Sequence, residues 1–505
     1  MKLNTKLVVT QIDEYARTNP SRVWAAIPVD DNNLSKGFKD ITYGEFANAI
    51  GHACAWLNAT LPPAQLPFET IAYAGPKDVG YPIMAVAAAK IGRKLLLPSP
   101  FASVEAQSHL IRASECKTFL HGEQNAAVVH QVLSKSSGIE APALQVPPLS
   151  DWLFNEHLAS FHFEKSPDDA KNDPWLIFHT SGTTGLPKLI TYTHGMMAAL
   201  HDAKGMPDAE DKSMLNHFAN RRWYTPLPSL HVVGMVVALQ FPILCGGVVV
   251  IGPAGSGPTT PTAAREVMIH GQVQGSMVSP ALIDDMCATA EGLECLRNLD
   301  CLYFAGAPLS PSTAAKLIGH VPIKPAMGST EAGAYFLRIT GDEDWEYYSF
   351  LPGMGMQFQP TSSGSLYEAV IVRDAALEAW QQVFHVYPEL QEFHTKDLFA
   401  KHPSRPDFWK YIGRTDDLII FSHGEDLYAT GMEMEIAAAH GSISAELLPI
   451  VEDANRNCSE LVKLTAELIL FTTAEKRLVR TSKNTVARRE SEELYRDEIE
   501  SLYTM

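Results

Sequence analysis

Apolar and polar positions along the chain follow two different periods. Apolar side chains recur at helical spacing through residues 46–57, and Thr42 and Glu45 just before them have the spacing of a capping box, which starts a helix. Residues 77–92 predict a second, largely apolar helix, whereas residues 246–252, "GGVVVIG", form a β-branched run typical of a buried strand. Because helical and strand segments alternate, the pattern predicts an α/β fold with layered sheets.

Composition and charge indicate which classes of binding partner the protein is not expected to have. With 505 residues, 46% of them hydrophobic, the chain can bury a large core and is expected to form more than one domain. Its 40 Lys and Arg residues against 58 Asp and Glu give a net charge of −18, which repels nucleic acid and anionic membrane surfaces. The seven cysteines lack CxxC spacing and no apolar run reaches membrane-spanning length. We therefore expect a cytoplasmic protein with reduced thiols, bound neither to nucleic acid nor to a membrane.

A loop rich in glycine and hydroxyl groups, "HTSGTTGLPK" at residues 179–188, follows a short apolar run. Glycine amides, hydroxyls and a lysine are groups that surround phosphate oxygens, although such a cluster alone can also be a surface turn. Pro187 precedes Lys188 and Leu189 follows it, which disfavours a P-loop ATPase or kinase, since the P-loop needs glycine before and Ser or Thr after the lysine. A strand and a helix with Thr193 as N-cap follow, so we expect the loop between two strands at a sheet edge.

Four further motifs combine turn residues with charged groups. They are "MGSTEAG" at 327–333, "HTKDLF" at 394–399, "YIGRTDDLIIFSHGEDL" at 411–427 and "TSKNTVARR" at 481–489. Together with the first loop, they occur in the order seen in the superfamily of acyl- and aryl-CoA synthetases, nonribosomal peptide synthetase adenylation domains and firefly luciferase, which the chain resembles over nearly its whole length. It looks most like the adenylation domains of fungal nonribosomal-peptide-synthetase-like enzymes and carboxylic acid reductases.

The resemblance implies a fold, a domain division and an activity. Residues 1–414 would form a large N-terminal domain of layered β-sheets with flanking helices, which binds ATP and the acid. Residues 415–505 would form a small, mobile α+β C-terminal domain that carries the catalytic lysine. The carboxylic acid would attack the α-phosphate of Mg-ATP to give an acyl-adenylate and pyrophosphate. A thiol would then take the acyl group, either the phosphopantetheine of a carrier domain in cis or in trans, with a reductase or thioesterase downstream, or coenzyme A.

The match assigns roles to residues of the first two motifs. In the loop, the β- and γ-phosphates would be held by Thr180, Ser181, Gly182, Thr183, Thr184, Gly185 and Lys188. In the second motif, Gly328 and Ser329 would belong to the ATP site and Thr330 would contact the α-phosphate. Glu331 would bind Mg²⁺, a hard cation that prefers carboxylate oxygen.

Charged residues of the later motifs receive the remaining roles. Asp397 would accept hydrogen bonds from both ribose hydroxyls, and Arg414 would reinforce the ribose and phosphate contacts. Lys483 would bridge the substrate carboxylate and the α-phosphate, where charge develops in the transition state, and Asp416 would be the hinge of the C-terminal domain. For each residue taken alone, the alternative is an ordinary solvated surface charge.

The acid itself is the least specified partner. In "PLPSLHVVGM", His231 stands where domains specific for α-amino acids carry an aspartate that pairs with the amino group. Because an unpaired buried ammonium is costly, we expect an aryl or other acid without an α-amino group, with a packed core histidine as the alternative role of His231. The other expected pocket walls are Val232, Met235, Phe304, Ala305, Gly306, Ala326, Met327 and Ala334.

The chain departs from the family pattern in several places. The interval between Asp416 and Lys483 is short, which suggests a trimmed C-terminal domain, and Ser482 replaces the usual glycine before the lysine. Lys396 stands where glycine is common and Met327 where tyrosine is common. Two alternatives to carrier loading therefore stay open: a free-standing acyl- or aryl-CoA ligase, and a non-catalytic docking module of the same fold.

Overall fold

The structure is a computed structural model. It describes residues 6–502 except 101, 154, 157–160, 181–185, 203–205, 207–212, 256–258, 362–365, 416–417, 421–425, 429–469, 471, 474–475 and 480–487. In the described parts of the chain, no helix is long and apolar enough to cross a membrane.

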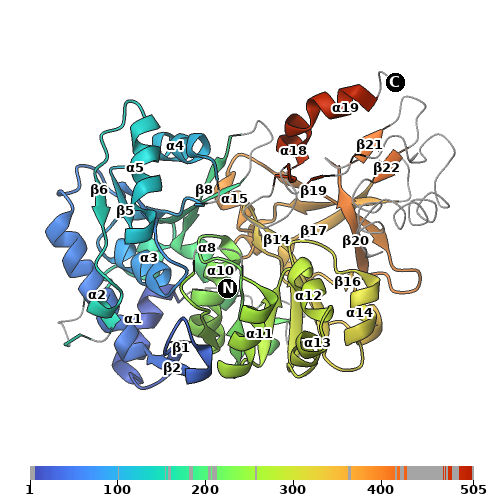
Figure 1. Ribbon diagram of the computed structural model, residues 1–505, viewed down its shortest axis with the longest axis horizontal. Coiled ribbons are helices and arrows are strands. Elements are labelled where there is room, and N and C mark those ends of the chain that lie inside the picture. Colours follow the sequence, from blue (N-terminus) through green and yellow to red (C-terminus); the bar gives the residue numbers. More distant parts are fainter. Residues whose placement is uncertain are drawn as a thin grey trace.

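A six-stranded sheet lies in the N-terminal part, on the left of Figure 1, with the strand order β6-β5-β3-β4-β7-β8. Its strands are β3 (Thr70–Ala74), β4 (Lys94–Leu96), β5 (Thr118–His121), β6 (Ala143–Gln145), β7 (Pro174–Thr180) and β8 (Lys188–Thr193). The first five in this order are parallel, and β8 runs antiparallel to β7 at the edge.

A second sheet of seven strands packs beside the first, in the order β13-β12-β11-β9-β10-β1-β2. Its strands are β1 (Val23–Pro28), β2 (Phe38–Thr42), β9 (Arg222–Tyr224), β10 (Val248–Val250), β11 (Gly275–Val278), β12 (Cys301–Ala305) and β13 (Ile323–Ala326). Only β2 runs antiparallel to its neighbour. The predicted buried strand is therefore confirmed as β10, which lies between β9 and β1.

A third, antiparallel sheet has the order β16-β20-β19-β18-β17 and lies on the right of Figure 1. Its strands are β16 (Tyr347–Tyr348), β17 (Met356–Pro360), β18 (Tyr367–Val372), β19 (Glu392–Lys401) and β20 (Trp409–Arg414). Two small pairs complete the described strands: β14 (Gly328–Ser329) with β15 (Gly333–Ala334), and β21 (Leu418–Ile420) with β22 (Asp426–Tyr428).

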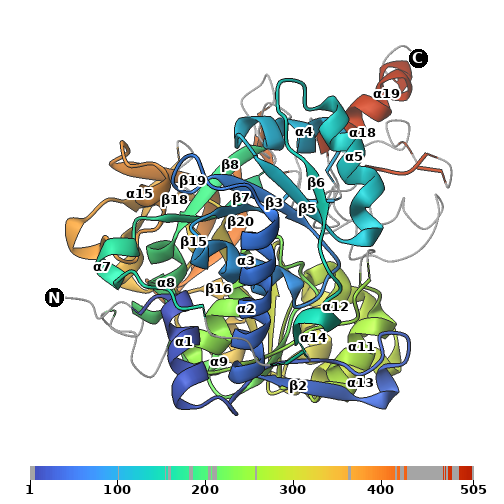
Figure 2. The same cartoon turned by 90° about the vertical axis from the view of Figure 1, so that its left-hand side faces the viewer.

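Helices flank the sheets (Figures 1 and 2). The α-helices up to residue 202 are α1 (Val8–Thr18), α2 (Tyr43–Thr60), α3 (Gly80–Lys90), α4 (Val104–Ala113), α5 (Ala126–Lys135), α6 (Ser150–Leu153), α7 (Pro167–Ala170) and α8 (His194–Asp202). The later ones are α9 (Leu215–Phe218), α10 (Val232–Met235), α11 (Pro261–His270), α12 (Pro280–Cys287), α13 (Ala290–Arg297), α14 (Pro311–Leu317), α15 (Val383–Val386), α18 (Arg488–Leu494) and α19 (Arg496–Leu502). The π-helix η4 (Val236–Cys245) continues α10, and short 3-10 turns are η1 (Leu34–Lys36), η2 (Glu123–Asn125), η5 (Asp342–Asp344), η6 (Pro352–Met354) and η7 (Ala375–Leu377).

The first predicted helix start is confirmed. Thr42 Oγ1 accepts a hydrogen bond from the Glu45 amide at 3.2 Å, and the Glu45 carboxylate accepts one from the Thr42 amide at 2.7 Å. This capping box opens α2, whose Phe46 ring stacks on Trp24 of β1 with centroids 3.5 Å apart. The helix is therefore fixed at its start by local hydrogen bonds and along its length by core packing.

The layered α/β architecture predicted from the sequence is confirmed. In the seven-stranded sheet, alternate residues of one strand pack in two different cores. Tyr303 and Ala305 of β12 pack in the large central core, whereas Leu302 and Phe304 pack in the core under α11–α14. Because both faces of β12 are covered, this strand is apolar throughout. The division of the chain at residue 414 stays a prediction, since much of the following segment lies outside the described residues.

Three histidines beside these sheets, His194 buried and His179 and His217 half-buried, predict a loss of stability in acid. Burial lowers the pKa of His179, His194 and His217 to about 4. Between that value and the ordinary pKa of about 6.5, the unfolded chain binds more protons than the folded one, so the free energy of unfolding falls as the pH falls. The slope is at most about 1.4 kcal/mol per pH unit for each histidine.

His194 is the best position to test this. Its ring stacks on Trp175 with centroids 4.8 Å apart, and within the described structure its buried Nδ1 has no hydrogen-bond partner. We expect His194→Phe to keep the stacking and to lose less stability than wild type between pH 7 and pH 5 in urea unfolding. The exposed His320→Phe is the control and should follow wild type. Identical pH profiles for His194→Phe and wild type would contradict the prediction.

Candidate active site

The ends of the predicted phosphate loop are held by two paired strands. Thr180 at the end of β7 lies opposite Lys188 at the start of β8 in an antiparallel ladder, so the chain reverses between them. The predicted position of the loop, between two strands at the edge of a sheet, is confirmed, and Thr193 Oγ1 caps α8 by accepting a hydrogen bond from the Met196 amide at 3.2 Å. The central residues 181–185 lie outside the described structure.

The motif at residues 327–333 docks onto the loop-bearing strand. The Tyr192 hydroxyl of β8 donates a hydrogen bond to the Thr330 carbonyl at 2.9 Å. Within the motif, β14 pairs with β15, and Gly333 has a φ of +73° that favours glycine. A Cβ on Gly328 would lie only 2.4 Å from the Gly333 carbonyl oxygen, so both glycines are needed for this tight turn. The turn holds Thr330 and Glu331 half-buried beside the loop.

The predicted ribose ligand and its arginine face each other on neighbouring strands. Asp397 of β19 pairs with Arg414 of β20, and the guanidinium Nη1 lies 3.5 Å from the carboxylate Oδ1. Asp397 is buried, its residue being 7% exposed, whereas the Arg414 side chain is 41% exposed. The arrangement places a buried carboxylate beside a partly exposed guanidinium. An ionised carboxylate has two acceptor oxygens, the number that the two hydroxyls of a ribose can meet.

Three tyrosines connect these motifs, and sequence reasoning missed all of them. Burial raises the pKa of Tyr335 above its ordinary range, and the negative charges of Asp397 and Glu331 raise it further. Burial and then Glu331 raise the pKa of Tyr192 in the same way, and the pKa of Tyr387 likewise. Glu331 thus affects the pKa of all three tyrosines, and Asp397 that of Tyr335. The inward alternation of β8 was a signal for Tyr192, but nothing local indicated the other two.

The expected acid-pocket residues differ in burial: some pack in or against the central core, and others are half-buried or border open space. Met235, Ala305 and Ala326 are buried in the central core, and Val232 and Met327 pack against it. Half-buried His231 precedes α10, half-buried Ala334 lies in β15, and Gly306 has a φ of +94° with open space where a Cβ would stand.

Phe304 does not belong with them. Its side chain packs in the core under α11–α14, with its ring 6.2 Å from that of Trp345. Neighbouring residues of a strand point to opposite faces of the sheet, so Phe304 and Ala305 cannot line one pocket with their side chains. The structure thus separates Phe304 from Ala305, and its role in the acid pocket stays a prediction.

Comparison with known families identifies the fold and its chemistry. A family model described as AMP-binding enzyme matches residues 13–356, and one described as AMP-binding enzyme C-terminal domain matches residues 418–505. The chain belongs to the AMP-binding enzyme family. The predicted resemblance to adenylate-forming enzymes is confirmed, and the motifs described above are those of an adenylate-forming enzyme.

Curated relatives of this AMP-binding enzyme are longer proteins. A carboxylic acid reductase of Neurospora crassa is 29% identical over 432 residues, which are 84% of this chain and 40% of the relative. An isocyanide synthase-NRPS hybrid of Aspergillus fumigatus is 28% identical over 82% of this chain and 27% of the relative. The chain thus spans two fifths or less of the length of these two relatives.

Solved structures show the same fold across nearly the whole chain. The anthranilate CoA ligase AuaEII, in complex with anthranoyl-AMP, has a TM-score of 0.74 and 14% identity, covering 100% of this chain and 99% of its own. ATP-bound MatB from Rhodopseudomonas palustris has a TM-score of 0.72 and 17% identity, covering 97% of this chain and 99% of its own. At this identity, the likeness concerns the fold alone.

The residues present fit Mg²⁺ that arrives with ATP better than a resident metal. Within the described part of the chain, no group of three His, Cys, Asp or Glu side chains is placed to hold a metal ion. Mg²⁺ usually keeps several waters and binds one or two carboxylates together with substrate phosphates. The single half-buried carboxylate of Glu331 meets that requirement.

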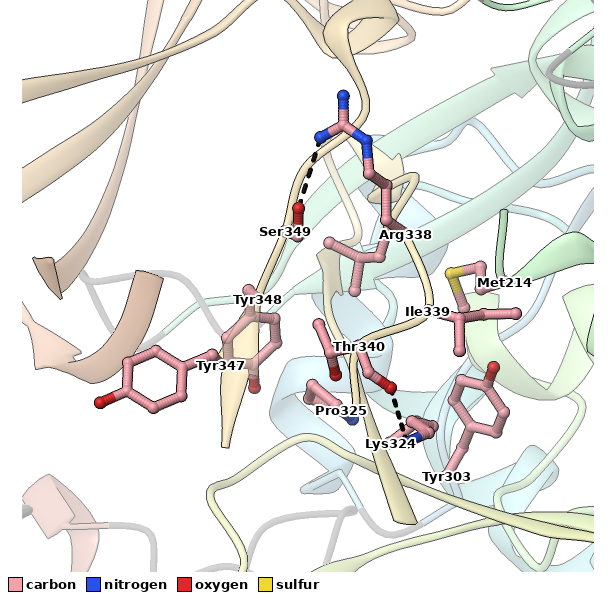
Figure 3. A pocket seen from close by; sticks show the side chains of 11 residues that line it. Met214, Tyr303, Lys324, Pro325, Arg338, Ile339, Thr340, Tyr347, Tyr348 and Ser349 are labelled. Carbon is pink, nitrogen blue, oxygen red and sulfur yellow. Dashed lines mark hydrogen bonds between the residues drawn. The ribbon is translucent and has the colours of Figure 1, made fainter. Parts of the chain in front are cut away.

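A small cavity behind the acid-pocket strands is not part of the site (Figure 3). The ammonium of Lys324 donates hydrogen bonds to the Thr340 carbonyl at 2.8 Å and to Asp342 at 3.0 Å beside it. The cavity has a volume of about 10 Å³, which is room for one water. We therefore assign Lys324 a structural role.

Lys396 stands where the family commonly has glycine, and its backbone conformation explains why glycine is common there. Its φ is +66°, in the left-handed region that is costly for residues with a Cβ. We expect Lys396→Gly to raise the free energy of unfolding by up to about 1 kcal/mol, measured by urea unfolding. Lys401→Gly, in the same strand but with ordinary backbone angles, should lower it by about 0.5–1 kcal/mol. Equal losses in both variants would contradict this account.

The structure does not describe every predicted functional residue. Hinge residue Asp416 and catalytic residue Lys483 lie outside the described residues, as do Ser181, Gly182, Thr183, Thr184 and Gly185 of the loop. Their roles stay predictions from the motifs.

Proposed function

We propose that this chain activates a carboxylic acid with Mg-ATP, releasing pyrophosphate, and passes the acyl group to a phosphopantetheinyl thiol of a carrier protein. The observation that carries the proposal is the convergence of three motifs. The turn with Thr330 and Glu331 is bonded to the strand that follows the phosphate loop. Tyr335, just after this turn, has its ring 6.2 Å from that of Phe350, which in turn lies 5.8 Å from the ring of Phe399 on the strand that carries Asp397. A nucleotide lying across these motifs would have its phosphates at the loop and its ribose at Asp397.

The chemistry then assigns each residue a task. A carboxylate oxygen of the acid attacks the α-phosphorus, the bond to the bridging oxygen breaks, and pyrophosphate leaves. Such a transfer needs positioning and charge neutralisation more than covalent help. Asp397 fixes the ribose, Thr330 meets the α-phosphate, and Lys483 neutralises charge between the carboxylate and the phosphate. Glu331 would hold the Mg²⁺ that accompanies ATP, and the ion would supply further charge neutralisation. In the second step the thiol sulfur attacks the acyl carbonyl carbon and AMP leaves.

The substrate we propose is an aryl or other hydrophobic acid without an α-amino group. The apolar residues Met235, Ala305 and Ala326 support this class, since they offer no charged partner for an ammonium. His231 at the start of α10 stands where an ammonium-binding aspartate would be required.

The acceptor we propose is a carrier domain, in cis or in trans, with a reductase or thioesterase acting on the thioester. The greater length of the curated relatives supports this, because their names include a carboxylic acid reductase and an NRPS hybrid. Coenzyme A is the second candidate acceptor.

The test is acid-dependent pyrophosphate release from Mg-ATP across a panel of aryl, aliphatic and amino acids. We expect release with a few aryl or hydrophobic acids and none with α-amino acids. Adding either a phosphopantetheinylated carrier or coenzyme A then distinguishes the two acceptors. ATP binding without release for any acid would overturn the proposal in favour of a docking module.

A further inference from the structure

A second cavity lies in the first sheet, at the carboxyl ends of β3, β5 and β6. We call it the β3–β5 crevice. Its volume is about 420 Å³, within the range of small-molecule sites, and its walls include Tyr73, Asp78, Gly122, Glu123, Gln145 and Trp152. None of the motif residues assigned to ATP or the acid lines it.

The strand order explains why a hollow forms there. From β3 the chain passes through α3 to β4 on one side, and from β5 it passes through α5 to β6 on the other side. The two connections therefore leave the sheet edge in opposite directions, and the crevice lies at the strand ends between them. In open parallel sheets, ligands bind at such a topological switch point.

Side chains pack closely against the glycine backbone at the floor of the crevice. A Cβ on Gly75 would lie 2.1 Å from the Tyr73 hydroxyl, and one on Gly80 would lie 2.7 Å from Asp78 Oδ1. The Tyr81 hydroxyl lies 3.3 Å from both the amide nitrogen and the carbonyl oxygen of Gly75. The floor is thus built from glycine backbone, a tyrosine pair and one carboxylate.

The polar groups of the crevice favour a cation. Its described lining contains two carboxylates, Asp78 and Glu123, and no lysine, arginine or histidine. Burial raises the pKa of Asp78 to about 7, and the nearby negative charge of Asp31 adds to the effect. In the described structure, the Asp78 carboxylate accepts a hydrogen bond from the Gly80 amide at 2.7 Å, and its remaining lone pairs leave acceptor capacity for a ligand.

The opposite wall is apolar. Buried Trp152 and half-buried Leu149 contribute it, with Val146 and two prolines beside them. A ligand that fits both walls carries a positive charge at one end and an aromatic or aliphatic body at the other. An ammonium brings three donors to a region that offers mainly acceptors.

We propose that the β3–β5 crevice binds a small organic ammonium ion, whose charge pairs with Asp78 and whose apolar body lies against Trp152. This site is separate from the proposed adenylation site and is tested without ATP, so the two proposals can fail independently.

The probe is 2-phenylethylammonium, with 2-phenylethanol as its uncharged counterpart, both titrated by calorimetry. We expect one site for the amine and at least about tenfold weaker binding of the alcohol. Asp78→Asn keeps an acceptor for the Gly80 amide and should weaken amine binding at least about tenfold, because it removes the charge. Its melting temperature is measured alongside.

A second pair of variants does not touch the Asp78 carboxylate. Gln145→Lys places a cation in the exposed rim of the crevice and should weaken the amine several-fold, whereas Gln131→Lys adds the same charge to an exposed face of α5 and should not. Absence of amine binding, equal binding of amine and alcohol, or equal effects of the two lysine variants would each overturn the proposal. The expected pattern in both pairs would establish it.

Discussion

Replacing Lys483 by alanine is expected to lower the rate of acid-dependent pyrophosphate release by about 100-fold or more, the loss typical when a group that stabilises transition-state charge is removed. Transfer of the acyl group from a supplied acyl-adenylate to the thiol should stay within a few-fold of wild type, since the lysine acts in the first half-reaction. The two half-reactions are measured separately, by pyrophosphate release and by thioester formation.

Asp416→Pro is the matched variant with the opposite expected pattern. Proline fixes the backbone dihedral that a hinge must change, so adenylation should persist while thioester formation falls. Equal loss of both half-reactions in Lys483→Ala, or unchanged thioester formation in Asp416→Pro, would show that these roles belong to other residues.

Asp397→Asn is expected to lower kcat/KM for ATP by about 10- to 100-fold, because hydrogen bonds to a charged group contribute about 1.5–3 kcal/mol. The amide keeps the size of the side chain and one acceptor oxygen, but it loses the charge that faces Arg414 and adds a donor toward the ribose. Steady-state kinetics at varied ATP measure the effect, and KM for the acid should change little.

The control for this variant is Asp407→Asn, in the exposed connection between β19 and β20. It removes the same charge from the same hairpin without touching the Asp397–Arg414 pair, and its kinetics should match wild type. If Asp407→Asn impaired ATP use as much as Asp397→Asn, the effect would be one of net charge and the ribose assignment would be wrong.

Local features of the fold were predictable from the sequence. The capping box of Thr42 and Glu45, the buried strand β10 and the loop between β7 and β8 depend on residues a few positions apart, and all three are present. The order of the motifs also led to the family. These predictions succeeded because local hydrogen bonds and apolar periodicity depend on residues that are close together in the sequence.

Features that depend on distant contacts were not predictable. The hydrogen bond from Tyr192 to the Thr330 carbonyl joins residues 138 positions apart, and the place of Tyr387 near Glu331 follows from the packing of α15 beside β8. The separation of Phe304 from Ala305 was also not predictable, because the sequence does not say which core each alternate position of β12 enters. Lys396 was noted as a departure from the family, but only its φ of +66° shows why glycine is common there.

The β3–β5 crevice belongs to the same class of feature. Asp78 and Trp152 carry no motif, and their meeting requires the strand order β6-β5-β3-β4, which periodicity alone does not give. The six-stranded sheet therefore carries the predicted phosphate loop, which a sequence motif identifies, and also the β3–β5 crevice, which no motif identifies.

The most direct test of the central claim is detection of the product of the first half-reaction. The protein is mixed with Mg-ATP and an acid that gives a response in the panel, and the quenched mixture is analysed by mass spectrometry. We predict an acyl-AMP of the mass set by that acid, formed together with an equal amount of pyrophosphate and absent in Lys483→Ala. ADP and inorganic phosphate in place of acyl-AMP and pyrophosphate would contradict the account.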